Sequence, residues 1–399
     1  MRILYLIDSP SDLASPSGRH VALGLARMAQ RDGCQVSVVA VHAGAAHDAD
    51  SDAVQLIDGI PLTSWPLSPS PESAARFRQW ATEQAFDVVH VFEHTTVQDA
   101  HQVLSELSVP RIVSLMGEPR ELEAGQLQRL QSASARLAPS DFAAQFWRQQ
   151  LKGARVRVVP HGVDLLGLIH AEPTVTERPG AQTALPTLAF CAPFDPSSGV
   201  EVLLQALGHL PGLALRLLLR GRWGGDERFA RRMRGLVAAD TRVQLELIDG
   251  NDPDQGIAPL LGRFDLLCVP TLQAQAFAWP VHECAAAGRH CLASNLGDAA
   301  EAVRRWRCGS LVPAGDVTAW AQAIAHWFTA QQAGAAARRA GMNLASGMNT
   351  SMGTSIGMIM DTSMDMAMPV PHRLEEQAFL VQSLYRAAVR GAQAGPTGR

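Results

Sequence analysis

Short apolar runs alternate with longer amphipathic segments along the first half of the chain. Residues 3–7, 35–41, 87–92 and 111–115 are each rich in Val, Ile and Leu, which predicts buried strands. Residues 20–30 place apolar side chains at helical spacing, and we expect a loop over residues 9–18 before them. Continuous apolar strands separated by helices are typical of parallel sheets that are covered on both faces.

The same alternation starts again after a polar stretch rich in Pro and Thr, residues 171–186, which we interpret as a linker. Two such series predict an α/β protein with two doubly wound, Rossmann-like domains facing a cleft, over residues 1–165 and 166–340. Ligands of such sheets bind beyond the carboxyl ends of the strands. In the second series we expect strands over 187–190, 214–219, 243–248 and 266–269, and helices over 200–210, 227–238, 281–287, 299–305 and 317–327.

Residues 341–372 differ in composition from the rest of the chain, because they hold eight of its twelve methionines among Ser, Thr and Gly. Thioethers are soft ligands for Cu(I), and a methionine-rich surface can bind other proteins. Neither the spacing nor the flanking residues define a site, so we favour a low-complexity insertion. A final helix over residues 374–390 is expected within a C-terminal segment, residues 373–399.

Charge and composition exclude several classes of protein. The net charge of -4 argues against nucleic-acid binding, which needs a basic surface. The apolar run at the start is too short for a signal peptide, and no uncharged apolar stretch reaches the roughly 18 residues of a membrane span. The six cysteines form no CxxC pair, which favours free thiols and no metal site. We therefore expect a cytoplasmic protein, and peripheral contact with the inner membrane face stays open.

Several motifs follow one another in an order that resembles glycosyltransferase family 4, whose members are retaining enzymes of the GT-B fold. Residues 159–164 read Val-Pro-His-Gly-Val-Asp, similar to the family's domain junction. Residues 190–207 are similar to the opening of its second domain, and residues 277–288, which contain Glu283, resemble its donor-binding helix. Gly18 lies in a similar feature of the first domain. The resemblance covers nearly the whole chain apart from the methionine-rich segment.

The resemblance implies a nucleotide-diphosphate sugar as donor, bound mainly by the second domain, and no resident cofactor. It implies an acceptor that is a sugar, a lipid-linked molecule or another small molecule, bound mainly by the first domain. Glu283 would hold the ribose hydroxyls, because a carboxylate accepts two hydroxyl hydrogen bonds. The other positions that it places at the nucleotide are Gly18, Ser198, Gly199, Phe277, Ala278 and Trp279. Amides at the start of the helix would face the diphosphate, whereas we expect the Phe277 and Trp279 side chains in the core.

Four positions depart from the family pattern. Gln275 stands where the family has its first acidic residue, and Met116 stands where it has a histidine near the reacting sugar. Pro193 and Ser198 replace the arginine and the lysine that bind the diphosphate. Neither replacement can neutralise a diphosphate, and proline also lacks an amide N–H.

Two functions therefore compete. In the first, the protein transfers a sugar with a remodelled site, in which Gln275 bonds sugar hydroxyls and Arg220 or Arg222, after the strand over 214–219, supplies the missing charge. In the second, it is a catalytically degenerate binding or scaffold protein that could partner a homologous subunit. A donor other than a nucleotide sugar is a weaker third reading. Further polar candidates, each more often structural, are His161, His282, Glu93 and His94.

Overall fold

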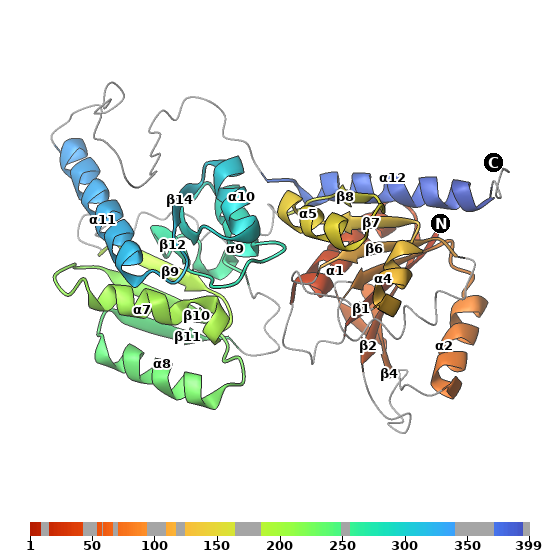
Figure 1. Cartoon of the computed structure of the whole chain (residues 1–399), viewed down its shortest axis with the longest axis horizontal. Coiled ribbons are helices and arrows are strands. Elements are labelled where there is room, and N and C mark those ends of the chain that lie inside the picture. Colours follow the sequence, from red (N-terminus) through yellow and green to blue (C-terminus); the bar gives the residue numbers. More distant parts are fainter. Residues whose placement is uncertain are drawn as a thin grey trace. The chain divides into compact units, whose positions relative to one another are not determined.

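The chain folds into two compact α/β units, seen in a computed structural model (Figure 1). One unit comprises Met1–Val163 together with His372–Arg399, and the other comprises Asp164–Pro371. The predicted linker up to residue 184 and the methionine-rich segment up to residue 370 lie outside the described residues. The structure describes residues 1–8, 16–42, 54–57, 59–66, 71–93, 109–116, 124–163, 185–248, 256–339 and 371–393.

The first unit is built around a sheet with the strand order β3-β4-β2-β1-β5-β6-β7-β8. Neighbouring strands are parallel except β3 and β4, which form an antiparallel pair at one edge. The sheet is the buried centre of the unit, since the apolar side chains of its central strands β2, β1, β5 and β6 are almost completely covered. Its strands are β1 (Arg2–Asp8), β2 (Gln35–His42), β3 (Val54–Ile57), β4 (Ile60–Pro66), β5 (Val88–Glu93), β6 (Arg111–Leu115), β7 (Ala135–Ala138) and β8 (Val156–Val158).

Helices of this unit come from both ends of the chain (Figure 1). Helix α1 (Pro16–Arg31) begins two residues before Gly18, so the loop predicted through residue 18 ends earlier than expected. Proline suits a first helical turn because its missing N–H has no partner there in any case. Helix α12 (Leu374–Gln393) confirms the predicted final helix and packs against α1 and β5. The remaining helices are α2 (Pro71–Glu83), α4 (Ala124–Gln131) and α5 (Asp141–Gln150).

The second unit has a parallel sheet with the order β11-β10-β9-β12-β13-β14. Helices surround it, and α7 and α11 pack together over the core. The strands are β9 (Thr187–Cys191), β10 (Arg216–Gly221), β11 (Val243–Leu247), β12 (Leu266–Val269), β13 (Cys291–Ser294) and β14 (Gly309–Val312). The helices are α7 (Val200–Gly208), α8 (Glu227–Ala239), α9 (Trp279–Ala286), α10 (Gly297–Trp306) and α11 (Val317–Arg339), with 3-10 turns η1 (Pro196–Ser198) and η2 (Ala258–Leu260).

The two sheets confirm the predicted doubly wound α/β class, but one strand is shifted. The apolar run expected as a strand over 214–219 starts in a turn, where Leu215 N–H donates to Leu213 O (3.1 Å). The strand pairing begins only at Arg216 and continues to Gly221. Arg220 therefore lies inside β10, opposite Cys191 of β9 and Glu246 of β11, and does not follow the strand as expected.

Three further features of the described residues bear on function. No helix there has the length and apolar character that crossing a membrane requires. All six cysteines are free thiols, five of them buried. The same part of the chain contains no group of three or more His, Cys, Asp or Glu side chains placed to hold a metal ion.

Candidate functional site

The order of the second sheet reverses between β9 and β12, and the loops that follow these two strands touch at this point. Gly199 has a φ of +74°, and a Cβ atom on it would lie 1.8 Å from the carbonyl oxygen of Pro270. Leu272 N–H donates to Ser197 O at 2.8 Å across the same contact. Only glycine fits this approach. The strand reversal is the place where ligands of open α/β sheets bind.

Two amides of the loop after β9 are bonded to a carboxylate of the same loop. The carboxylate of Asp195 accepts hydrogen bonds from Ser197 N–H (2.8 Å) and Ser198 N–H (3.0 Å). The Ser198 hydroxyl donates to the backbone oxygen of Asp195 (2.8 Å). Pro193 is exposed in this loop. Positions 193 and 198, where the family pattern has cations, thus contribute no positive charge. The amides of residues 197 and 198 are already hydrogen-bonded to the carboxylate of Asp195.

Glu283 of α9 reaches the end of β9. Its Oε2 accepts a hydrogen bond from Ile257 N–H (3.1 Å). Gly256 approaches so closely that a Cβ on it would lie 2.7 Å from Glu283 Oε1. The thiol of Cys191, the last residue of β9, donates to the Gly256 carbonyl (3.3 Å). The carboxylate of Glu283 is therefore held in place at the carboxyl edge of the sheet.

The segment from Gln275 to Trp279 joins β12 to α9 and packs against α10. The Gln275 carbonyl accepts a hydrogen bond from Asp298 N–H (3.1 Å). The Ala278 N–H, which is buried, donates to Asp298 Oδ2 (2.7 Å). This amide is thus bonded inside the protein. The ring of Phe277 stacks on His282 with centroids 4.0 Å apart and meets Trp279 edge-on at 4.9 Å, so both aromatic side chains pack within the unit.

Arg220 belongs to a cluster of three charged side chains. Its guanidinium lies 3.9 Å from Glu246 Oε2. Arg263 donates to both oxygens of the same carboxylate, with one of these contacts at 3.1 Å, and this raises the pKa of the Arg263 guanidinium. One carboxylate thus contacts two guanidinium groups. Arg222 is half-buried just past β10, and its carbonyl accepts from Phe194 N–H (2.7 Å) in the loop after β9.

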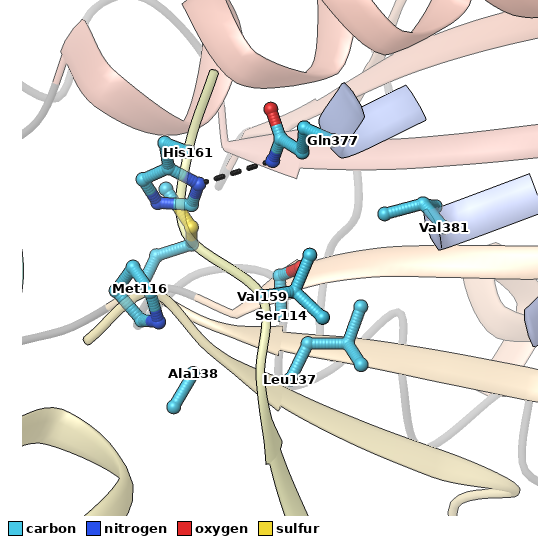
Figure 2. A pocket seen from close by; sticks show the side chains of 9 residues that line it. Ser114, Met116, Leu137, Ala138, Val159, His161, Gln377 and Val381 are labelled. Atoms are coloured by element: carbon cyan, nitrogen blue, oxygen red, sulfur yellow. Dashed lines mark hydrogen bonds between the residues drawn. The ribbon is translucent and has the colours of Figure 1, made fainter. Parts of the chain in front are cut away.

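The first unit has a small pocket beyond the carboxyl ends of β6, β7 and β8 (Figure 2). The side-chain amide of Gln377 donates to His161 Nδ1 (3.2 Å), and Gln377 Oε1 accepts from Gly162 N–H (2.8 Å). Helix α12 thus fixes the junction motif that the sequence singles out. Met116 is buried in the pocket wall. The lining residues are Ser114, Met116, Leu137, Ala138, Pro139, Val159, His161, Gln377 and Val381.

A buried polar chain lies next to this pocket. His90 of β5 hydrogen-bonds to the Tyr385 hydroxyl through Nδ1 (2.5 Å) and to the Ser114 hydroxyl through Nε2 (2.8 Å). Complete burial lowers the pKa of His90 to about 3, because the imidazolium ion would lose its hydration. His90 is therefore neutral at physiological pH and acts here as a structural hydrogen-bonding group.

The structure brings most of the predicted site residues to one edge. Ser198, Gly199, Arg220, Arg222, Gln275, Phe277, Ala278, Trp279 and Glu283 all lie at or beyond the carboxyl ends of β9, β10 and β12. Gly18 belongs to the other unit, in the first turn of α1.

Sequence reasoning missed the acidic partners Asp195, Glu246 and Asp298. Asp195 and Asp298 each follow a buried strand by a few residues, a signal that could have identified them. The sequence does not indicate a role for Gln377, because this residue lies more than 200 positions from the motif that it contacts.

Comparison with known proteins gives a consistent assignment. A family model for Glycosyltransferase Family 4 matches residues 18–165, and one for Glycosyl transferases group 1 matches residues 185–329. The chain is 28% identical over 267 residues to a phosphatidyl-myo-inositol mannosyltransferase of Mycobacterium leprae, covering 64% of this chain and 67% of that protein. It is 28% identical over 275 residues to a D-inositol 3-phosphate glycosyltransferase of Nocardia farcinica, covering 61% and 54% respectively. These matches therefore span about half to two thirds of the relatives' lengths.

Solved structures share the fold over nearly the full length. A glycosyltransferase from Rickettsia africae has a TM-score of 0.72 at 17% identity, covering 98% of both chains. Anabaena Alr3699/HepE in complex with UDP-glucose has a TM-score of 0.65 at 16% identity, covering 99% of this chain and 98% of that one. With a family model on each side of the junction, and with these neighbours, the chain belongs to the family 4 glycosyltransferases and has the GT-B fold.

Proposed function

We propose that this protein transfers a sugar, with retention of anomeric configuration, from a nucleotide-diphosphate sugar to a hydroxyl group of an acceptor. The observation that carries the proposal is the fixed Glu283 carboxylate at the carboxyl edge of the second sheet, next to the strand reversal. The names of the relatives, a mannosyltransferase and an inositol phosphate glycosyltransferase, support sugar transfer. Anabaena Alr3699/HepE, which has a similar fold and was solved in complex with UDP-glucose, supports a nucleotide-sugar donor.

Glu283 is the residue that we propose for the ribose of the donor. A carboxylate accepts about four hydrogen bonds, and the bond from Ile257 N–H orients this one. Ribose presents two adjacent hydroxyl groups, which donate to the two oxygens of one carboxylate. Gly256 lies so close to both oxygens that a side chain there would displace the carboxylate.

The departing diphosphate needs positive charge that residues 193 and 198 do not supply. We propose that Arg220 and Arg222 supply it, because both lie at the carboxyl end of β10, beside the loop after β9. Gln275, which carries no charge, would hydrogen-bond hydroxyls of the transferred sugar.

For the acceptor, the relatives' names favour a molecule that contains an inositol ring, either free as a phosphate or in a lipid headgroup. A hydroxyl group of this ring would attack the anomeric carbon and replace the diphosphate. We propose that the reaction takes place in the cytoplasm, and at the inner membrane face when the acceptor is lipid-linked.

The first experiment is a screen of UDP-, GDP- and ADP-linked sugars for protection against thermal unfolding. Hits are then incubated with inositol phosphates, and the product anomer is identified by NMR. Transfer with retention supports the proposal. Binding without transfer would favour the degenerate binding protein, and binding of no nucleotide sugar would reject both the donor and Glu283's role.

The second experiment tests Glu283 by calorimetry with UDP and GDP. Glu283→Ala should weaken the affinity about 10- to 100-fold, since a hydrogen bond to a charged group contributes ~1.5–3 kcal/mol. Asp265→Ala is the matched control, because Asp265 also accepts a backbone N–H, that of Thr187 (2.8 Å), but at the amino ends of the strands. Equal affinities of Glu283→Ala and the wild type would remove this residue from the site.

The third experiment tests the arginines by turnover. Loss of one oxyanion-hole donor, a group that stabilises developing negative charge, lowers kcat by about 10²–10³-fold. We expect Arg220→Ala or Arg222→Ala to show a decrease of this order. Full turnover in both variants would show that the charge comes from elsewhere.

A further inference from the structure

Asp298, in the first turn of α10, is a buried carboxylate with unusual bonding. Only 1% of the residue is exposed. A single oxygen, Oδ2, accepts two hydrogen bonds, one from Ala278 N–H (2.7 Å) and one from His282 Nε2 (2.8 Å). A buried carboxylate with such partners fixes whatever donates to it, because breaking a bond would leave charge uncompensated.

The protonation of His282 follows from its second neighbour. The indole N–H of Trp306 lies 3.1 Å from His282 Nδ1, and an indole nitrogen can only donate. Nδ1 must therefore accept, and the proton of the neutral ring is on Nε2, where it is donated to Asp298. The bonds run in one direction, from Trp306 through His282 to Asp298, so they link the end of α10 to its beginning by way of α9.

This chain of bonds holds residues 275–278, the last part of the connection from β12 to α9, at both ends. At one end, Gln275 O accepts from Asp298 N–H, and Gly297 packs so closely that a Cβ on it would lie 2.9 Å from Gln275 N and O. At the other end, Ala278 N–H is bound by Asp298 Oδ2. Between them, Phe277 stacks on the His282 ring. The backbone of residues 275–278 is thus fixed against α10.

The same bonds connect two residues that the proposed function uses. Gln275 lies at one end of the clamped segment, and Glu283 directly follows His282 on α9. A change that released His282 from Asp298 would let the start of α9 shift against residues 275–278, and the Gln275 and Glu283 side chains would move relative to one another.

We propose that Asp298 and His282 are positioning residues for the sugar-nucleotide donor, acting through the backbone of residues 275–278; this rests on the proposed function of the same site. They act by hydrogen-bond geometry, with the Nε2–H of His282 and the Oδ2 of Asp298 as the groups that matter. The positioning affects binding of the donor and leaves binding of the acceptor unchanged.

Paired variants separate geometry from fold. Asp298→Ala removes both bonds, whereas Asp298→Asn offers one oxygen that can accept both. His282→Gln places an amide N–H where Nε2 was and keeps the donor to position 298. His282→Asn places an acceptor where Nδ1 was, so it keeps the Trp306 bond and loses the one to Asp298. The Trp306 indole N–H resonance, assigned with Trp306→Phe, verifies by NMR which variants keep that bond.

The readouts are KM for the donor, KM for the acceptor and kcat in the full chain, with calorimetric affinity for UDP and GDP. Misplacement of a site by about 1 Å can lower activity by about 10²-fold, so we expect Asp298→Ala and His282→Asn to raise the donor KM at least about tenfold. The acceptor KM should stay within about twofold. Asp298→Asn and His282→Gln should restore the donor KM to within about threefold of the wild type.

The outcomes are distinguishable. A wild-type protein that binds no nucleotide would overturn both the proposed function and this inference. A wild type that binds and transfers, with Asp298→Ala and His282→Asn lowering only the melting temperature and leaving the donor KM unchanged, would overturn the inference alone. Equal loss in His282→Gln and His282→Asn would likewise overturn it, because the Asp298 bond would then not be the one that matters.

Discussion

At the scale of single residues, close approaches of glycine backbone to polar atoms shape the candidate donor site. Gly199 lets the loop after β9 pass against Pro270, and there the obstacle to a side chain is backbone. At Gly256 the obstacle is different, because the nearest atoms are the carboxylate oxygens of Glu283, the far end of a flexible side chain. A methyl group at 199 would disturb the fold, whereas one at 256 would displace mainly the carboxylate.

Gly256→Ala should therefore weaken nucleotide binding while the protein stays folded. The added Cβ, 2.7 Å from Glu283 Oε1, forces the carboxylate to move. We expect UDP or GDP affinity to fall about tenfold or more, in line with the strength of a hydrogen bond to a charged group, with only a small change in melting temperature. Calorimetry and thermal unfolding of the same samples measure the two effects.

A matched glycine provides the control for this prediction. Gly235 lies within α8, and a Cβ on it would meet nothing within 4 Å. Gly235→Ala should stabilise the protein by about 0.5–1 kcal/mol, because alanine loses less backbone entropy in a helix. Its nucleotide affinity should equal that of the wild type. Unchanged affinity in Gly256→Ala as well would show that the nucleotide does not depend on the position of Glu283.

How far single residues could be predicted depends on whether a motif contained them. The predictions for Glu283 and Gln275 rest on their spacing within one motif, which comprises α9 and the loop before it. Asp298 could not be placed, because its partners His282 and Ala278 lie 16 to 20 positions away, on α9 and in the loop before it. A polar residue of that kind becomes meaningful only when the packing of α9 against α10 is known.

At the scale of elements, α12 completes the first unit by adding polar groups to its interior. Tyr385 of α12 hydrogen-bonds to His90, and the two residues are 295 positions apart. Gln377, two turns earlier on the same face, bonds both His161 and Gly162. Buried polar groups of this kind are stable only when each has a partner, so the helix and the sheet depend on one another.

His90 makes the stability of this unit depend on pH. The folded-state pKa of about 3 lies below the unfolded value of about 6.5, so below pH 6.5 the unfolded chain binds a proton that the folded chain does not. Stability from this group is fully present above pH 6.5 and is lost as pH falls towards 3. The loss amounts to about 2 kcal/mol at pH 5.

The contribution of His90 to stability is measured by comparing the wild type with His90→Gln in urea unfolding experiments at pH 7.5 and 5.0. The substitution destabilises the protein at pH 7.5 because it disturbs the bonds to Tyr385 and Ser114. At pH 5.0 its destabilising effect should be about 2 kcal/mol smaller, since the wild type alone has lost the histidine contribution. The same mutational effect at both values of pH would contradict the buried neutral state.

Length alone did not decide which elements were predicted. Helices α8 and α12 and strands β2 and β6 show clear patterns and were predicted, and so was β12 with only four residues. Strands β7, β13 and β14, also of four residues, were not predicted, and neither were the longer β4 and α2. The shift of β10 has a local cause. Leucines continue from the preceding turn into the strand, so hydrophobicity alone does not mark where pairing starts.

At the scale of the whole molecule, the chain leaves the first unit after Val163 and returns to it at His372. The first unit is therefore closed by the last segment of the chain, and the second unit is formed by one continuous segment. Contacts between segments this far apart in sequence form only when the long intervening chain is closed into a loop, which costs conformational entropy. We expect the second unit to fold independently of the C-terminal helix and the first unit to require it.

A chain that ends at Pro371 tests this dependence. It lacks the buried side chains of Ala378, Val381 and Tyr385, and it leaves the Gly162 N–H and His90 Nδ1 without their α12 partners. Burial of each large apolar side chain contributes about 1.5–3 kcal/mol, so the loss is a sizeable share of the ~5–15 kcal/mol that stabilises a domain. Hydrogen exchange should show loss of protection in β1 and β5, with β9 and β12 as protected as in the full chain.

A chain that ends at Gln393, which keeps all of α12, is the control and should match the full chain in both units. Equal loss of protection in the two sheets, or no loss in either, would show that α12 does not close the first unit.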